Sequence, residues 1–131
     1  MTGRLTTAEA RRDAGDWHDA AEAYAAHLAA RPDDFAAWVQ HGHCVKEAGD
    51  PAAALESYRR AAAGLPDDAD VQLQIGHALK LTRDLAGARA AYGRALQLDP
   101  TMIAAWREVA ALLHVAAPGE SAGDGGLSLL D

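Results

Sequence analysis

Four residue types recur at intervals of 34 positions along this chain of 131 residues. The recurring residues are Pro32, Pro66 and Pro100, Tyr24, Tyr58 and Tyr92, Ala20, Ala54 and Ala88, and Asp16, Asp50 and Asp84. A fixed period of this length indicates a solenoid, because each repeat is a small unit that cannot bury its apolar face alone and so stacks on its neighbours. The sequence therefore predicts a repeat fold.

The composition of the chain favours helical repeats. Alanine, which has the best helix propensity, is abundant, whereas aromatic residues make up only 5% of the chain and leave little from which to build a sheet. We expect a single all-α domain of seven helices. The expected spans are about 7–14, 17–30, 35–48, 51–63, 69–82, 85–98 and 102–116.

Capping side chains mark where several of these helices begin. Thr6 and Glu9 form a capping box, which predicts that the first helix starts there. Asp50 and Pro51 place a carboxylate at an N-cap and a proline at the first helical position, where its missing N–H costs nothing. The same capping role is expected of Asp16 and Asp84, and of the pairs Asp33–Asp34 and Asp67–Asp68.

The residues at the repeated positions form a known pattern. They include Trp38, Gly42, Ala54, Tyr58, Pro66, Gly76, Ala88, Tyr92, Pro100, Trp106 and Ala110. This pattern resembles the tetratricopeptide repeat (TPR), a pair of helices A and B with the signature W-x2-L-G-x2-Y, then A-x3-F, then P. The resemblance implies a right-handed α-solenoid of three TPR helix pairs, in repeats 1–34, 35–68 and 69–102, followed by a capping helix at 102–116.

The repeat register also assigns packing roles. Trp38, Trp106 and Cys44 are expected in the core, where Cys44 is a small buried residue rather than a reactive thiol. Gly42 and Gly76 are expected where an A helix touches its B helix. A larger side chain at Gly76 should therefore overpack that contact and lower stability.

The net charge and the absence of targeting signals indicate which classes of partner and which cellular compartment to expect. A net charge of −7 and a pI near 5.2 argue against a nucleic-acid partner. The N-terminus carries no apolar leader segment and no run of 18 apolar residues occurs, so we expect neither export nor a membrane span. With Cys44 as the single cysteine, no intrachain disulfide is possible, which is compatible with a cytoplasmic location.

The TPR resemblance implies a binding surface. In TPR arrays the A helices line a concave groove that binds extended peptides through fixed repeat positions. The corresponding groove residues are Arg12, Val39, Gln40, His43, Lys46, Leu73, Gln74, His77, Lys80 and Arg107. We therefore expect a non-enzymatic protein–protein interaction module whose partner is a protein or peptide with acidic or carboxylate groups.

Two details qualify this groove. The lysine with which chaperone-binding arrays grip a carboxylate is missing, because its positions hold Leu5, Val39 and Leu73. His43 and His77, with reference pKa values near ~6.5, should add positive charge only on acidification. An acidic peptide should therefore bind more tightly as the pH falls towards about 6.

No catalytic constellation occurs in the sequence, and we expect no enzymatic activity, no cofactor and no metal. His41, His43 and Cys44 are close in sequence, but residues two apart on a helix point to nearly opposite sides. His41 and His43 therefore cannot share one ion.

The C-terminal part of the chain leaves alternatives open. Residues 117–131 are expected to be a flexible glycine-rich tail with an apolar end. Trp106, Ala110 and Leu113 have no following B helix to cover them, which indicates an oligomer interface in a homodimer, or a tail that folds back. Residues 73–81 resemble repeats that precede glycosyltransferase domains in bacterial proteins, so a second alternative is an N-terminal scaffold module of such an enzyme.

Overall fold

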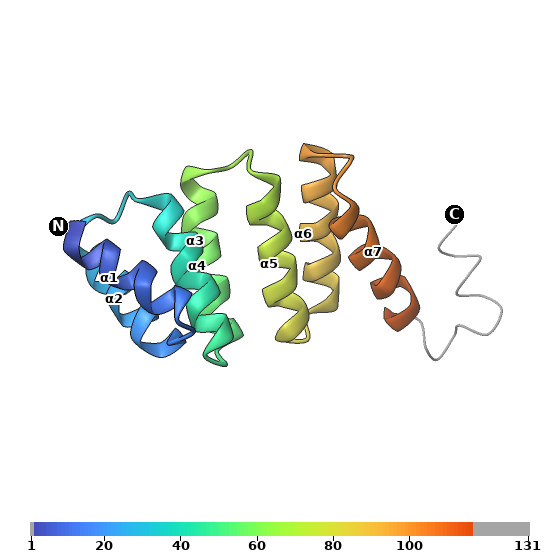
Figure 1. Cartoon of the computed structure of the whole chain (residues 1–131). Helices are drawn as coiled ribbons and strands as arrows, with labels where there is room; N and C mark the ends of the chain where they lie inside the picture. The colour runs from blue at the N-terminus through green and yellow to red at the C-terminus, as the bar shows by residue number, and fades with distance from the viewer. Residues whose placement is uncertain (1, 117–131) are drawn as a thin grey trace.

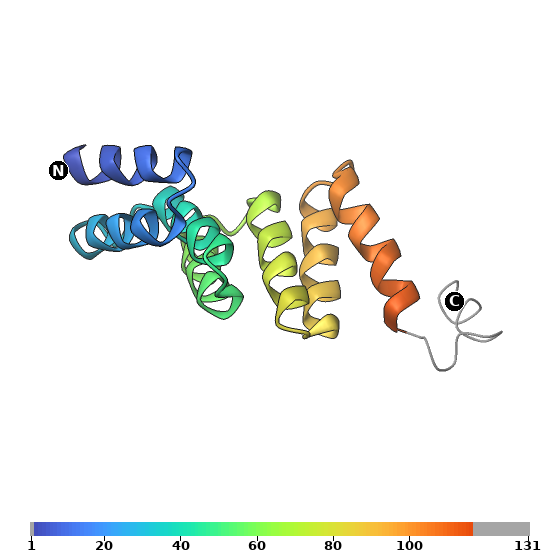
Figure 2. The ribbon, with the colours of Figure 1, turned by 60° about the horizontal axis from the view of Figure 1, so that its bottom comes forward.

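The computed structural model describes residues 2–116, which form seven α-helices and no strand. The helices are α1 (Thr2–Asp13), α2 (Trp17–Ala30), α3 (Phe35–Glu47), α4 (Pro51–Gly64), α5 (Ala69–Leu81), α6 (Leu85–Leu98) and α7 (Ile103–Ala116). Each packs chiefly against the helices before and after it in the chain. Figure 1 and the turned view in Figure 2 show the array that results, with α1 and α7 at opposite ends. The predicted all-α, right-handed solenoid is confirmed.

Aspartate side chains begin four of the helices. The Asp50 carboxylate accepts from the Ala53 N–H at 3.0 Å, and Pro51 occupies the first turn as expected. Asp34, Asp68 and Asp84 cap α3, α5 and α6 in the same way. The expected cap at Asp16 is wrong, because its side chain makes no hydrogen bond to the first turn of α2.

The turns between paired helices share one backbone conformation. Gly15, Gly49 and Arg83 occupy equivalent positions and have φ angles of 81°, 103° and 70°. Each donates its N–H to the carbonyl three residues earlier, at distances of 2.9 to 3.0 Å, and so closes the end of an A helix. Glycine adopts this left-handed conformation without strain, whereas Arg83 does so against its own steric preference.

The first helix begins earlier than the sequence predicted. It starts at Thr2 rather than near residue 7, so Thr6 lies inside the helix and the predicted capping box is wrong. The extension has a packing cause, because Leu5 lies against the apolar cluster that contains Ala8 and Ala20. Burial of Leu5 favours the additional helical turn over a cap at Thr6.

The core is built from tyrosines that lie against glycines. Tyr58 and Tyr92 are fully buried, and their rings lie where a Cβ atom on Gly42 or Gly76 would stand, only 2.5 and 2.4 Å from the nearest ring carbon. The predicted glycine contacts between A and B helices are therefore confirmed. Cys44 is also fully buried, as predicted.

The two tryptophans of the TPR pattern differ in exposure. The indole N–H of Trp38 donates to the Pro32 carbonyl at 2.9 Å, and that of Trp106 donates to Pro100 at 2.8 Å. Trp38 is half-buried beneath α4, whose Arg60 guanidinium lies 5.0 Å from the ring centroid. Trp106 is 55% exposed, so its predicted core position is wrong. Within residues 2–116 no B helix follows α7 to cover it.

Candidate functional site

The A helices α1, α3, α5 and α7 carry polar side chains at recurring repeat positions, and we call this set of side chains the A-helix face. Its members are Arg12, Gln40, His43, Lys46, Gln74, His77, Lys80 and Glu108. Two hydrogen bonds join neighbouring repeats across it. Arg12 of α1 donates to the side-chain amide oxygen of Gln40 on α3 at 3.1 Å, and Lys80 of α5 donates to the Glu108 carboxylate of α7 at 2.6 Å.

Buried tyrosines orient the imidazoles of the A-helix face. His43 Nδ1 lies 2.6 Å from the Tyr58 hydroxyl, and His77 Nδ1 lies 2.8 Å from that of Tyr92. Each imidazole also packs edge-on to its tyrosine, with ring centroids 5.4 and 5.5 Å apart. Because Nδ1 is occupied in both rings, Nε2 is the atom left for a ligand.

The first repeat uses a different partner for its tyrosine. Glu9 stands where the later repeats have histidine, and its side chain is exposed. The Tyr24 hydroxyl instead accepts from Arg12 at 3.0 Å, and Arg12 also binds the Asp13 carboxylate at 3.0 Å. This hydrogen bond to Asp13 raises the pKa of the Arg12 guanidinium. Arg12 is therefore committed to contacts within the chain and is not a free cation for a ligand.

The two imidazoles do not behave as the sequence predicted. Burial lowers the pKa of His43 and of His77 below the ordinary histidine value, and the charge of Lys46 lowers both further. Both rings are therefore neutral near pH 7, and they gain positive charge only at a lower pH than the ordinary histidine pKa predicted.

Four of the predicted groove residues are basic, and the structure engages two of them in contacts within the chain. The Lys80 ammonium is neutralised by Glu108 at 2.6 Å, and Arg12 is engaged as described. The side chain of Lys46 is half-buried and makes no hydrogen bond or ion pair within residues 2–116. Arg107 is exposed and likewise unpaired in that part of the chain. Two of the four predicted cations thus remain available.

The apolar groove residues lie deeper than expected. Leu73 is only 7% exposed and belongs to the core cluster, so it is not a ligand-contacting residue as predicted. Val39 is half-buried and packs against the same cluster. Between its charged groups, the A-helix face therefore presents mainly the neutral polar side chains of its glutamines and histidines.

The outer side of α7 carries the second predicted site. Trp106 and Ile103 are 55% and 64% exposed, and Ala110 is exposed beside them, whereas Leu113 is half-buried. The predicted interface residues Trp106, Ala110 and Leu113 therefore differ in exposure. The tail that was expected to be flexible, residues 117–131, lies outside the described residues.

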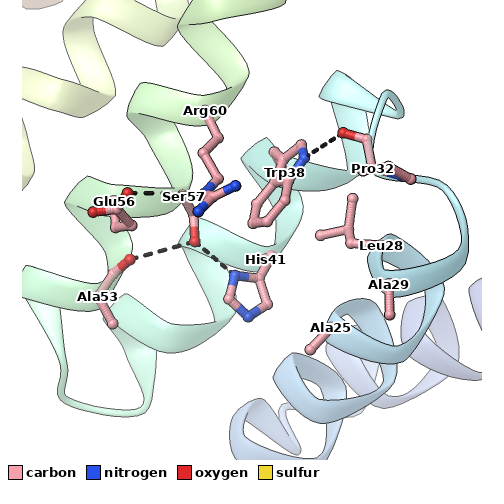
Figure 3. Close-up of a pocket in the computed structure, with 10 residues that line it drawn as sticks. All are labelled: Ala25, Leu28, Ala29, Pro32, Trp38, His41, Ala53, Glu56, Ser57 and Arg60. Carbon is pink, nitrogen blue, oxygen red and sulfur yellow. Dashed lines mark hydrogen bonds and ion pairs between the residues drawn. The ribbon is translucent and has the colours of Figure 1, made fainter.

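A pocket of about 560 Å³ lies between α2 and the α3–α4 pair. In Figure 3, Trp38 and His41 of α3 and Ser57 and Arg60 of α4 face the apolar side chains of α2 across this hollow. Its lining residues are Ala25, Leu28, Ala29, Pro32, Trp38, His41, Ala53, Glu56, Ser57 and Arg60. No sequence pattern marks this pocket, because it depends on how repeats one and two stack.

The polar groups of this pocket are mostly satisfied by one another. His41 Nδ1 lies 2.6 Å from Ser57 Oγ, and that hydroxyl donates to the Ala53 carbonyl at 3.3 Å. Burial lowers the pKa of His41. A serine and a histidine at this distance could serve nucleophilic catalysis, but Ser57 is only 2% exposed, and its hydroxyl is out of reach of a substrate. The pair therefore fixes α4 on α3.

Among residues 2–116 no group of three or more His, Cys, Asp or Glu side chains is arranged to hold a metal ion. His41 and His43 lie against different side chains of α4, those of Ser57 and Tyr58. None of the described helices is both long enough and apolar enough to span a membrane.

Comparison with known proteins defines the class of fold. Residues 69–102, the α5–α6 pair, match the family model of the tetratricopeptide repeat. The whole array is a TPR solenoid, and solved structures share its fold. A crystal structure of MamA protein aligns with a TM-score of 0.83 at 22% identity, over 88% of this chain and 63% of that chain. This chain therefore spans less than two thirds of that relative. Among curated proteins, no relative matches.

Two of the similar structures contain peptides. The first TPR of Spaghetti (RPAP3) bound to the HSP90 peptide SRMEEVD aligns with a TM-score of 0.82 at 18% identity, over 88% of this chain and 92% of that chain. The Yersinia enterocolitica type III secretion chaperone SycD, in complex with a peptide of the translocator YopD, aligns at 0.79 and 17% identity, over 85% and 90% of the two chains. At these identities the likeness establishes the fold alone.

Proposed function

We propose that this chain is a non-catalytic protein-interaction module, whose A-helix face binds an extended peptide segment that carries carboxylates. The observation that carries the proposal is the Lys46 ammonium, which has no ion-pair partner among residues 2–116. It belongs to the same face as two amide side chains and two imidazoles, and buried tyrosines hold the imidazoles in place. Such groups can hydrogen-bond both to a peptide backbone and to an anionic side chain. Peptide complexes of the similar SycD and RPAP3 structures support this class of function.

The proposal predicts that blocking the A-helix face abolishes peptide binding. Ala36 is exposed on α3 one turn before Gln40, and Ala63 is exposed on the B helix α4. Peptides would be selected from a random library against the parent chain and titrated by fluorescence anisotropy. We expect Ala36→Trp to weaken the selected peptides by at least about tenfold, or ~1.4 kcal/mol, because the indole covers the face. Ala63→Trp, the matched control, should bind as the parent does; the reverse order of effects would place the site on the B helices.

A second candidate function is self-association through α7. Its support is the exposed apolar pair Ile103 and Trp106 at one end of the array. We expect Trp106→Glu to weaken self-association by more than about tenfold, because an unpaired carboxylate is costly to bury in an interface. Leu81→Glu makes a comparable change at another exposed apolar residue and should leave the association unchanged. Sedimentation velocity would measure both, and a parent chain that is monomeric at all concentrations would remove this candidate.

Two finer expectations stay predictions. One is that the chain is the N-terminal scaffold of a larger glycosyltransferase. It rests on the resemblance of residues 73–81 to repeats that precede glycosyltransferase domains. The other is a cytoplasmic location, which rests on composition and the lone cysteine.

A further inference from the structure

Three pairs of residues on the A-helix face are related by the same spacing of 28 positions. Each pair joins a basic residue near the end of one A helix to a residue in the middle of the next A helix, and we call each pair a rung. The rungs are Arg12 with Gln40, Lys46 with Gln74, and Lys80 with Glu108. The first and third are closed by hydrogen bonds of 3.1 and 2.6 Å. In the middle rung, neither side chain makes a hydrogen bond or ion pair within the described residues.

The open state of the middle rung has a chemical cause. In the first rung, the guanidinium of Arg12 has several N–H groups and binds Tyr24 and Gln40 together. In the second repeat, His43 takes the tyrosine hydroxyl, so Lys46 has no tyrosine partner. The third rung closes because Glu108 is a carboxylate, whereas Gln74 offers Lys46 only a neutral amide.

The charges around the middle rung leave Lys46 without a local counterion. Asp70, one turn before Gln74 on α5, and Glu47 on α3 are the acidic groups whose charges reach His43, while Arg12 adds positive charge. Neither of these two carboxylates forms an ion pair with the Lys46 ammonium among the described residues. Lys46 also acts on His77 of the next repeat. Its ammonium therefore lies within electrostatic reach of both imidazoles.

We infer that the middle rung is the anchor for a single carboxylate of the bound segment, held between the Lys46 ammonium and the Gln74 amide. This inference rests on the proposed function and names the chemistry of its contact. The third rung supplies the internal template, because there a carboxylate, that of Glu108 at the position equivalent to Gln74, binds the lysine ammonium of Lys80. The ligand oxygen would accept from Lys46 Nζ as Glu108 Oε1 accepts from Lys80, and the second oxygen would accept from the Gln74 side-chain amide.

The template also predicts a spectroscopic signature. The charge of Glu108 raises the pKa of the neighbouring His77 against the lowering effect of burial. A carboxylate in the middle rung should act on His43 in the same way, because it stabilises the imidazolium form. A bound carboxylate should therefore raise the pKa of His43, which an NMR titration of its ring protons reports independently of affinity.

The test measures the binding of an acidic probe to variants in which a rung gains or loses its carboxylate. Hexaglutamate serves as the probe, hexaglutamine as its uncharged counterpart, and binding is followed at constant ionic strength because exposed charges are screened within ~10 Å at 0.1 M salt. Gln74→Glu supplies Lys46 with an internal carboxylate and should weaken hexaglutamate about tenfold, while it raises the pKa of His43 without any probe. Gln97→Glu, an exposed site on α6, adds the same charge elsewhere and should bind as the parent does. Glu108→Gln frees Lys80 and should strengthen hexaglutamate binding.

The outcomes separate this inference from the proposed function. If library-selected peptides bind the A-helix face but Gln74→Glu and Gln97→Glu have equal affinity for hexaglutamate, the anchor lies elsewhere and the proposed function stands. The inference also fails if hexaglutamate does not bind the parent, or if it binds without raising the pKa of His43. If Ala36→Trp leaves the selected peptides unaffected, the proposed function itself fails.

Discussion

Replacing Gly76 by alanine should destabilise the array, although alanine is the better helix former. A Cβ atom at Gly76 would stand 2.4 Å from Tyr92 Cε1 and 2.6 Å from Cδ1. Tyr92 is fully buried, with its hydroxyl bonded to His77, so the ring cannot move aside without breaking that bond. We expect a net loss of about 1–3 kcal/mol in the free energy of unfolding, which urea denaturation would measure.

The same substitution at Gly93 provides the control. Gly93 lies in the middle of α6, and a Cβ atom there would meet nothing within 4 Å. Gly93→Ala should therefore increase the free energy of unfolding by about 0.5–1 kcal/mol, because it removes only the entropic cost of a helical glycine. Changes of the same sign in both variants would contradict the tight contact between α5 and Tyr92.

Two adjacent arginines of α1 should differ in their contribution to stability. Arg12 donates to the hydroxyl of buried Tyr24 and to Gln40, which joins repeat one to repeat two. Arg12→Met should leave the Tyr24 hydroxyl buried without that partner and lower the free energy of unfolding by about 1–3 kcal/mol. Because the loss falls at a junction between repeats, thermal unfolding followed by tryptophan fluorescence should show it first at Trp17 and Trp38.

Arg11→Met is the matched control for Arg12→Met. Arg11 pairs with Asp19 at 3.0 Å, but the two side chains are 47% and 54% exposed. Exposed ion pairs contribute at most about 1 kcal/mol, and salt weakens them further. Equal losses for the two variants would show that the contacts of Arg12 with Tyr24 and Gln40 add nothing beyond surface charge.

The position of the predicted groove residues on the A helices follows from sequence spacing. Gln40, His43 and Lys46 lie on α3 and Gln74, His77 and Lys80 on α5, as the repeat register assigned them. The spacing of 28 positions that relates the three rungs is also visible in the sequence. It shows which residues face one another across repeats, but not which rungs close.

What the sequence alone determined was the repeat and its internal packing. Helix propensity, the aspartate caps at Asp34, Asp50, Asp68 and Asp84, and the pairing of Gly42 and Gly76 with tyrosines act over one helix pair. Such local interactions recur with the period of the chain, because equivalent residues make the same contacts within successive helix pairs. The fold and its helix boundaries could therefore be predicted to within a residue or two beyond α1.

What only the tertiary structure decided was the state of the side chains between repeats. Burial makes Leu73 a core residue and keeps His43 and His77 neutral, and the stacking of α7 on α6 brings Glu108 to Lys80 while it leaves Trp106 exposed. Exposure and charge pairing depend on distances between helices that lie far apart in the sequence. A pattern of residue types carries no such distances. The sequence therefore did not show that Arg12 and Lys80 bind within the chain, whereas Lys46 and Arg107 have no side-chain partner among residues 2–116.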